Sequence, residues 1–392
     1  MFLRATPDGA TWTTVNFGET GAISFKATGA VQFSYAFEGI RHTYVPAVAG
    51  EATVPDLRPR HAGPTTLHVY AYDVVGNRSA RTDYAMYVPP RDSGDGPGDT
   101  GGDGIPDLMF VDNAGNLRTY AGDVDENDTT SDGELYAWLY SSYDNEGTLN
   151  PPGHWWNGTK AALITKHSDA YPGDGITDLF AVAPDGGFWL YPGDGYGSFD
   201  VDRRLRIILP GNAPNPSTWT QIKALGDITG DSRPDLALRS GGEFWVLSGY
   251  TGAGFQEATR MNHNAWADRE VLNIADIDLD GTPDLLWRNL VNGNMYIRHG
   301  RPGATPGSVD LVSLMLAANS RDGDVSYGTG WSAANMAVVV SIPDISGDNV
   351  PDMWVRYESD GKMRVYHPST TNTGPAVKLV LGDDWRIHKT FG

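Results

Sequence analysis

The sequence predicts an all-β chain, and three observations lead to this prediction. Glycine (48 residues) and proline (25 residues) are abundant among the 392 residues, which is typical of many turns and few long helices. Short runs with an apolar side chain at every second position recur, as in residues 31–37. One Asp-rich pattern recurs five times from residue 99 onward, and each copy leads directly into an apolar run.

The first 90 residues predict a small β-sandwich. Four alternating runs separated by turn residues are typical of antiparallel strands with one buried face; they cover residues 22–27, 31–37, 65–73 and 84–88. Residues 67–79 (LHVYAYDVVGNRS) resemble the late strand and turn of bacterial Ig-like modules, which implies an Ig-like spacer.

The domain organisation follows from a change in composition. Residues 91–98 are rich in Pro, Gly and Asp, have no apolar period, and predict a linker. We therefore expect an Ig-like β-sandwich over residues 1–90 and a second domain over residues 99–392.

The acidic composition restricts the partners. The formal net charge is −20, and a surface of this charge repels phosphate backbones, so nucleic acid is not an expected partner. The chain has no cysteine, which excludes disulfides and thiolate metal sites. No run of 18 apolar residues exists, so membrane insertion is not expected. Residues 1–4 do not resemble a signal peptide, and we expect a fragment or mature form of a secreted, extracellular protein; the alternative is a cytoplasmic protein.

The five copies of the Asp-rich pattern share one arrangement of carboxylates. Asp stands at positions 1, 5 and 9, a polar residue usually at position 3, Gly, Ser or Asn at position 6, and Pro usually at position 8. We number them loop one (99–107), loop two (169–178), loop three (227–235), loop four (276–284) and loop five (344–352). Loop two has one extra residue between positions 1 and 5.

This spacing predicts calcium sites, because Ca²⁺ takes six to eight oxygen ligands from a tightly turning loop. Side chains at positions 1, 3, 5 and 9 and the carbonyl oxygen at position 7 supply such ligands. The ligands expected in loops one to five, in that order, are Asp99, Asp103, Ile105, Asp107; Asp169, Asp174, Ile176, Asp178; Asp227, Thr229, Asp231, Arg233, Asp235; Asp276, Asp278, Asp280, Thr282, Asp284; and Asp344, Ser346, Asp348, Val350, Asp352. Loop four should bind best, and the alternative is that the loops are only turns.

The insertion after the first hairpin contains a further candidate calcium site. Asp123, Asp125, Asn127 and Glu134 match part of the EF-hand spacing, although Asp128 stands where that loop has Gly. The alternative for this segment is an acidic surface loop.

The segments on either side of each loop are also repeated. After the loop come a strand, a Gly turn and a second strand, then in the second and third copies a Gly-rich stretch ending in Phe199 or Phe255. A tryptophan precedes each loop from the second onward, at Trp155 or Trp156, Trp219, Trp266 and Trp331.

This unit resembles the FG-GAP/VCBS repeat, the blade of integrin-type β-propellers and related lectins. The resemblance covers residues 95–392 and implies a calcium-binding β-propeller. Loop one lacks a preceding tryptophan strand, and residues 384–391 supply one at the chain end. We therefore expect five blades closed by the C-terminal strand; a six- or seven-bladed ring with degenerate blades is the alternative.

No catalytic motif is present, so we expect a binding module and not an enzyme. The family resemblance favours lectin-like recognition of surface carbohydrate, and aromatic residues that can stack on sugars are Tyr196, Tyr250, Trp138 and Tyr140. The alternatives are a protein-docking or targeting subunit of a larger secreted, toxin-bearing assembly, which binds a surface protein or other subunits, and an accessory domain of a hydrolase.

Overall fold

The computed structural model describes residues 16–17, 19–37, 42–57, 59, 63–89, 93–124, 132–171, 173–262, 266–315, 324–380 and 384–392. Within these ranges the regular structure consists of β-strands and four short 3₁₀ helices, without an α-helix. The predicted all-β class is confirmed. No helix in the described ranges is long and apolar enough to cross a membrane.

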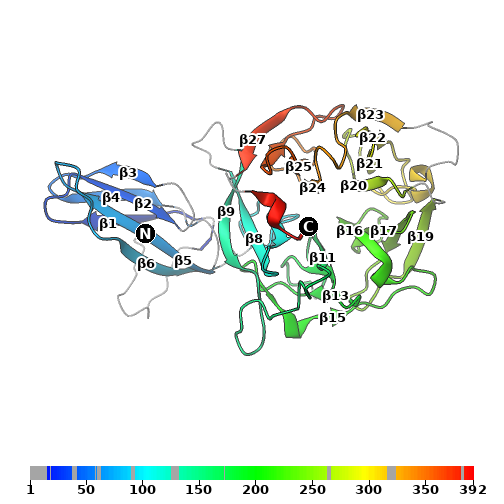
Figure 1. Cartoon of the computed structure of the whole chain (residues 1–392), viewed down its shortest axis with the longest axis horizontal. Coiled ribbons are helices and arrows are strands. Elements are labelled where there is room, and N and C mark those ends of the chain that lie inside the picture. Colours follow the sequence, from blue (N-terminus) through cyan, green and yellow to red (C-terminus); the bar gives the residue numbers. More distant parts are fainter. Residues whose placement is uncertain are drawn as a thin grey trace.

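The N-terminal part contains two antiparallel sheets, which Figure 1 shows in blue beside the rest of the molecule. Their strands are β1 (Gly21–Lys26), β2 (Gln32–Phe37), β3 (Thr43–Pro46), β4 (Glu51–Leu57), β5 (Gly63–Tyr72) and β6 (Thr82–Val88). β1 pairs with β4, and the other four follow the order β3-β2-β5-β6. Alternate side chains of both sheets, including Phe25, Phe33 and Leu67, form one core, as the period of two predicts.

The remaining chain forms five four-stranded sheets, which we number 1 to 5. Sheet 1 contains β28 (Thr390–Phe391), β7 (Leu108–Val111), β8 (Leu117–Val124) and β9 (Asp132–Tyr140). Sheet 2 contains β11 (Leu163–Lys166), β12 (Leu179–Val182), β13 (Phe188–Tyr191) and β15 (Leu205–Arg206). Sheet 3 contains β16 (Trp219–Gly226), β17 (Asp235–Ser240), β18 (Glu243–Ser248) and β19 (Glu257–Asn262).

Sheets 4 and 5 repeat this order. Sheet 4 contains β20 (Arg269–Ala275), β21 (Asp284–Asn289), β22 (Met295–Arg298) and β23 (Asp324–Gly328). Sheet 5 contains β24 (Val338–Ile342), β25 (Asp352–Arg356), β26 (Met363–Tyr366) and β27 (Ala376–Val380). A short parallel pair, β10 (Ser142–Tyr143) with β14 (Phe199–Asp200), lies outside them. The 3₁₀ helices are η1 (Val201–Arg203), η2 (Pro216–Thr218), η3 (Leu311–Leu314) and η4 (Trp385–Ile387).

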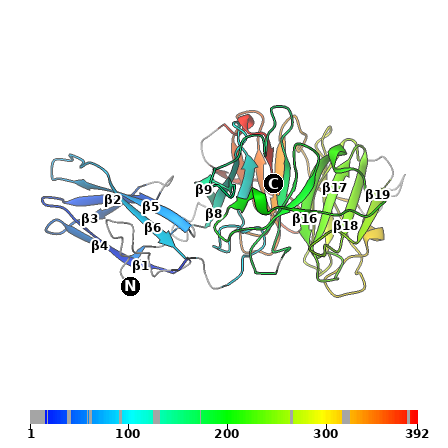
Figure 2. The same ribbon diagram turned by 90° about the horizontal axis from the view of Figure 1, so that it is seen from below.

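The five sheets follow one another around a common centre (Figure 1). β11 contacts β16 and β28, β16 contacts β20, and β20 contacts β24, so the first strand of each sheet faces that centre. Sheet 1 takes its first strand from the chain end, because β28 pairs with β7. Figure 2 shows the N-terminal sheets extending to one side of the five-sheet body.

The second strand of each sheet is buried on both faces. Every residue of β7 (LMFV) and β12 (LFAV) is buried, since a neighbouring sheet covers each face. Such strands appear in the sequence as continuous apolar runs without alternation. The start of the second strand, at each position-9 aspartate, is therefore predictable from the sequence alone.

A tryptophan separates each pair of neighbouring sheets. Trp155, Trp219, Trp266, Trp331 and Trp385 are each at most 3% exposed. Three of them donate their backbone N–H to the glycine carbonyl in the β-turn of the preceding sheet: Trp266 to Gly242 (3.0 Å), Trp331 to Gly293 (2.8 Å) and Trp385 to Gly361 (2.8 Å). Trp385 also packs against Phe110 and Tyr120, so it joins sheet 5 to sheet 1.

Arginines at the end of the second strand hold three of these tryptophans. Arg239 donates to the carbonyl oxygen of Trp266 (2.9 Å), Arg288 to that of Trp331 (3.2 Å) and Arg356 to that of Trp385 (3.3 Å). The equivalent residues of sheets 1 and 2 are Val111 and Val182. An arginine contact of this kind therefore reinforces the apolar packing where sheets 3, 4 and 5 meet the next sheet.

We expect Trp385→Ala to destabilise the five-sheet body by about 3–5 kcal/mol, because it leaves a cavity between sheets 5 and 1. The control is Ile387→Ala in the same 3₁₀ turn, whose side chain is 52% exposed and whose loss should change little. Urea unfolding followed by tryptophan fluorescence measures both. Equal stability of the two variants would show that the Trp385 contact does not hold the sheets together.

Candidate functional site

All five loops lie at the same place, immediately before the second strand of their sheet. The aspartate at position 1 folds each loop by accepting the backbone N–H of position 6. The bonds run to Asp99 from Gly104 (2.6 Å), to Asp169 from Gly175 (2.6 Å), to Asp227 from Ser232 (2.7 Å), to Asp276 from Gly281 (2.9 Å) and to Asp344 from Asn349 (2.6 Å). The repeat found in the sequence is thus a repeat of backbone geometry.

Positions 4 and 6 adopt a left-handed backbone in every loop. Position 4 is Gly102, Gly173, Gly230, Leu279 or Gly347, and position 6 is Gly104, Gly175, Ser232, Gly281 or Asn349. Glycine adopts positive φ without steric cost, which explains the sequence preference at both positions. The extra residue of loop two lies before Gly173, so positions 4 to 9 of that loop keep the common form.

The aspartate at position 9 connects the loop to the end of the third strand. It is at most 1% exposed in every loop. In four loops its Oδ1 accepts a glycine N–H, from within β8 in sheet 1 and from just beyond the third strand in sheets 2, 3 and 4: Gly122 to Asp107 (3.2 Å), Gly193 to Asp178 (3.0 Å), Gly249 to Asp235 (3.0 Å) and Gly300 to Asp284 (3.0 Å). In loop five Pro368 has no N–H, and His367 Nδ1 lies 2.9 Å from Asp352 Oδ1 instead.

Burial changes the acidity of these aspartates. It raises the pKa of Asp178 to about 7 and that of Asp235 to about 6. The pKa of Asp107 rises to about 6 because of burial and, second, the neighbouring Asp99. A bound cation favours the ionised form of such groups, so the site is chemically suited to one.

The loops differ in how closely they gather their ligand atoms. In loop one Asp99, Asp103 and Asp107 place one oxygen each within 4.8 Å of one another, and in loop four Asp276, Asp278 and Asp280 do the same. Within the described ranges loops two, three and five form no such group. The side chains predicted at position 3 of loops three and five bond inside the loop, Thr229 to Asp235 (3.0 Å) and Ser346 to Asp344 (3.2 Å).

Positions 5 and 7 also bond to each other. The N–H at position 7 donates to the carboxylate at position 5 in all five loops: Ile105 to Asp103, Ile176 to Asp174, Arg233 to Asp231, Thr282 to Asp280 and Val350 to Asp348. Because the N–H of position 7 bonds to the carboxylate at position 5, the carbonyl oxygen is the atom through which position 7 would bind a cation. The carboxylate groups of loops one and four consist of oxygen ligands, which suits calcium.

Two of the predicted stacking residues lie in packed positions. Tyr250 is 2% exposed and packs against Phe180 and Phe255, so its ring has no face for a sugar and we assign it to the core. Tyr196 packs against the N-terminal core, with its ring 5.5 Å from that of Tyr87. Sequence patterns show that an aromatic residue follows a Gly turn, but not whether another side chain covers it.

The other two stacking residues and the EF-hand-like site fall mostly outside the described residues. Trp138 and Tyr140 belong to β9, and their side chains are not described. Asp125 and Asn127 lie in the undescribed range 125–131, whereas Asp123 and Glu134 are opposite each other in the β8–β9 pair.

Tyr171 is an exposed aromatic residue that sequence reasoning missed. It occupies position 3 of loop two, is 42% exposed, and lies over Gly252 of sheet 3, where a Cβ atom would come within 2.7 Å of the ring. The one available signal was the extra residue in loop two, which places a tyrosine where other loops have a small or polar residue.

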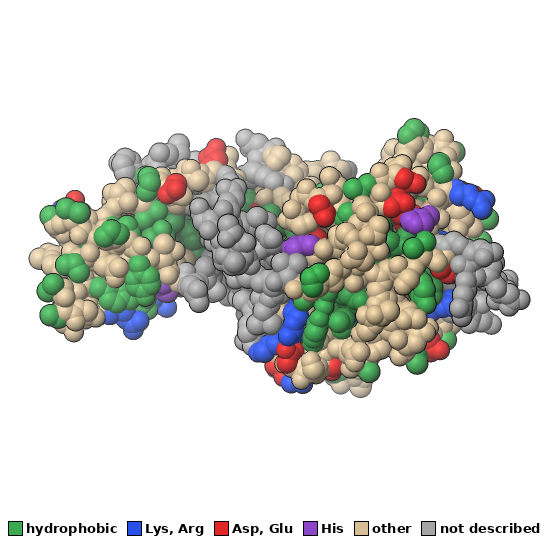
Figure 3. Space-filling model, turned by 90° about the horizontal axis from the view of Figure 1, so that it is seen from above, with side chains coloured by type: hydrophobic (Ala, Val, Ile, Leu, Met, Phe, Trp, Pro, Cys, Tyr) green, Lys and Arg blue, Asp and Glu red, His purple; other side chains and the backbone are tan. Residues whose placement is uncertain are grey.

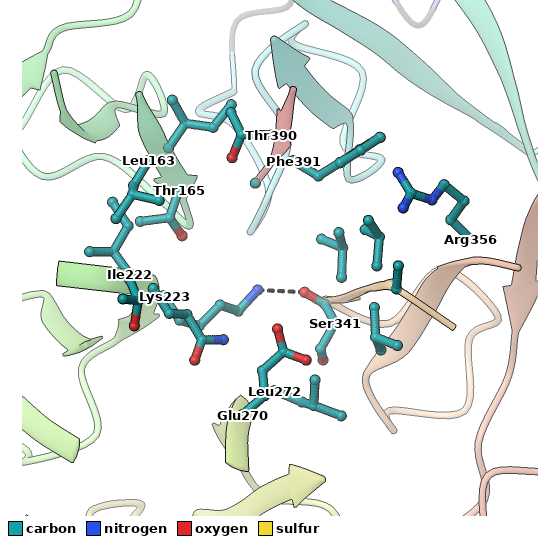
Figure 4. A pocket seen from close by; sticks show the side chains of 18 of the residues that line it. Leu163, Thr165, Ile222, Lys223, Glu270, Leu272, Ser341, Arg356, Thr390 and Phe391 are labelled. Atoms are coloured by element: carbon teal, nitrogen blue, oxygen red, sulfur yellow. Dashed lines mark hydrogen bonds between the residues drawn. The ribbon is translucent and has the colours of Figure 1, made fainter. Parts of the chain in front are cut away.

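A cavity of about 420 Å³ opens at the centre of the five sheets, lined by β11, β16, β20, β24 and β28. Figure 4 shows Lys223 reaching across it to the backbone oxygen of Ser341, with Glu270 nearby. Burial, and second the neighbouring Lys166, lower the pKa of Lys223 to about 7. Glu270 forms an ion pair with Arg288.

Acidic side chains gather in small groups on the face of the molecule that Figure 3 shows, and one group lies against a histidine.

The segment after residue 93 contacts loop two, since Asp95 N–H donates to Gly175 (2.7 Å) and Thr177 N–H donates to Asp95 (2.7 Å). Part of the predicted linker is therefore bound to the five-sheet body.

No protein-family model and no curated protein matches the chain. Among solved structures, it is similar to an Agrocybe aegerita lectin that recognises non-reducing terminal N-acetylglucosamine, with TM-score 0.37 and 12% identity over 83% of this chain and 94% of the lectin. It is also similar to a chain of the Photorhabdus luminescens Tc holotoxin pore, with TM-score 0.34 and 12% identity over 97% of this chain. The match covers 19% of that toxin chain.

We expect the metal-free protein to lose stability as the pH rises from about 4 to about 7. A carboxyl group whose pKa is raised in the folded state holds its proton more tightly than in the unfolded chain, so its ionisation favours unfolding. Urea unfolding of metal-free protein at pH 5 and pH 7.5 measures the effect. Asp178→Asn should reduce the pH dependence, and an unchanged dependence in that variant would contradict the assignment to Asp178.

Proposed function

We propose that the chain is a five-bladed β-propeller preceded by an Ig-like β-sandwich, and that it acts as a secreted, calcium-stabilised binding module without enzymatic activity. The observation that carries this proposal is the identical loop geometry at the start of the second strand in all five sheets. The pairing of β28 with β7 and the cavity among the first strands support a closed ring.

Calcium would bind in loops one and four, through the carboxylates that lie within 4.8 Å of one another in each. In loop one it would neutralise Asp107, a carboxyl group whose pKa burial raises. The described part of the central cavity is lined by charged and titratable side chains, which are Lys223, Glu270, Arg356, Arg386, His388 and Lys389, and Glu270 is paired with Arg288. The buried aspartates are bonded to backbone N–H groups, so their role is to hold the loops.

We expect excess calcium to raise the melting temperature of chelator-treated protein. A site filled a hundredfold above its dissociation constant contributes about 2.7 kcal/mol to stability. Asp99→Asn should reduce the increase, whereas Asp185→Asn, in a turn of sheet 2 away from the loops, should leave it intact. The measurement is thermal unfolding with calcium and with EDTA. If the melting temperature does not respond to calcium, the loops are turns held by their own hydrogen bonds.

The ligand we propose is carbohydrate on a cell or wall surface. The resemblance to FG-GAP lectins suggests it, and Tyr171 provides an exposed ring between sheets 2 and 3. An aromatic ring with a polar hydroxyl stacks on the apolar face of a sugar while polar groups beside it bind the sugar hydroxyls. This assignment moves the predicted stacking role from Tyr250 to Tyr171, because only the latter is exposed.

We expect Tyr171→Ala to weaken glycan binding at least tenfold, which corresponds to about 1.4 kcal/mol. Tyr44→Ala is the matched control, since Tyr44 is a 55% exposed tyrosine on the N-terminal sheets. A glycan array in calcium buffer, with N-acetylglucosamine-terminated glycans included, measures binding. Equal signals from the two variants would exclude Tyr171. Capture of a surface protein without any glycan signal would favour the docking alternative.

A further inference from the structure

Loop four carries a histidine that the calcium pattern does not use. His299 follows β22, and its Nδ1 lies 3.0 Å from Asp278 Oδ2 and 3.3 Å from Asp284 Oδ1. The three side chains place one ligand atom each within 4.8 Å of one another. Asp278 stands at position 3 of the loop and Asp284 at position 9, so the histidine adds a nitrogen to the loop from outside it.

Asp284 has an oxygen without a partner, unlike the position-9 aspartates of the other loops. In those four loops Oδ2 accepts the N–H groups of positions 2 and 3; the donors are Thr100 and Gly101, Ala170 and Tyr171, Ile228 and Thr229, and Ile345 and Ser346. Asp284 is 1% exposed, and its Oδ2 has no hydrogen-bond partner within the described residues. A buried acceptor left in this state costs stability unless a water molecule or a cation contacts it.

The ligand set decides which cation suits this place. Calcium prefers oxygen ligands only, whereas one imidazole and two carboxylates suit zinc and related transition metals. We propose that His299, Asp278 and Asp284 form a zinc-class site in loop four, distinct from the calcium ligands Asp276 and Asp280. His299 is 40% exposed and Asp278 is 29% exposed, so a fourth ligand reaches the metal from solvent.

Because Asp278 also belongs to the group with Asp276 and Asp280, the two sites share a ligand. Zinc bound through His299 therefore competes with calcium for loop four. Loop one has no histidine among its ligands and keeps its preference for calcium. Loop one would therefore prefer calcium and loop four zinc, although the sequences of the two loops follow one pattern.

His367 provides an internal comparison at the equivalent position of loop five. It follows β26 as His299 follows β22, and it lies 2.9 Å from Asp352 Oδ1. Asp352 Oδ2 accepts two backbone N–H groups, at 2.7 and 2.9 Å, and position 3 is Ser346 in place of an aspartate. Both oxygens of Asp352 are occupied, so His367 replaces the hydrogen bond that Pro368 lacks and forms no metal site.

The test is titration of chelator-treated protein with Zn²⁺ by calorimetry, and with Co²⁺ by its visible absorption, in His299→Gln and His367→Gln. We expect His299→Gln to weaken the tightest zinc site at least tenfold and to remove the cobalt spectrum, while His367→Gln retains both. Thermal unfolding in EDTA shows that each variant is folded. Added calcium should weaken zinc binding in wild type, because Asp278 is shared.

Equal zinc affinity in wild type and His299→Gln would overturn the proposal, as would a cobalt spectrum lost equally in both variants. These outcomes are independent of the proposed calcium-stabilised function. Calcium can stabilise loop one without zinc in loop four, and zinc can bind even where calcium does not alter the melting temperature.

Discussion

The five-sheet body depends on the hydrogen bonds of one buried residue, the position-9 aspartate at the start of the second strand of each sheet. In loops one, two and three its two carboxylate oxygens bond the start of the loop and the backbone in or just beyond the third strand, so one side chain fixes three segments. The acceptor must be buried to reach all three, and burial raises its pKa. Each of these sheets therefore carries a carboxylate that is structurally required and electrostatically costly.

The packing between sheets has a second repeated element, the tryptophan that precedes each first strand. The bond from Trp385 to Gly361 and the packing of Trp385 on Phe110 join sheet 5 to sheet 1. β28 then pairs with β7 through only two residues, Thr390 and Phe391. Hydrogen bonds from Lys389 to Val111 (2.8 Å) and from Gly392 to Met109 (2.9 Å) extend this short pair, and burial of the Trp385 indole adds an apolar contact between sheets 5 and 1.

Much of this arrangement was predictable from the sequence, because repeats, alternating runs and Trp-led strands are local patterns. The side-chain surroundings were not predictable. Tyr250 follows a Gly turn, as a ligand-binding aromatic can, but Phe180 and Phe255 from other segments cover it. His299 and His367 occupy equivalent positions, and their difference depends on which oxygens of a distant aspartate are already bonded. Spacing along the chain does not contain that information.

The loops are held together by their own hydrogen bonds as well as by any cation. Position 1 accepts the N–H of position 6, and position 5 accepts that of position 7, in every loop. A cation bound in a loop would therefore add its contacts to a backbone that is also held by hydrogen bonds. Metal preference then depends on side chains added to a fixed frame. His299 reaches Asp278 and Asp284 from outside loop four, so under the proposed zinc site the repeat would take a different ion without a change in the loop itself.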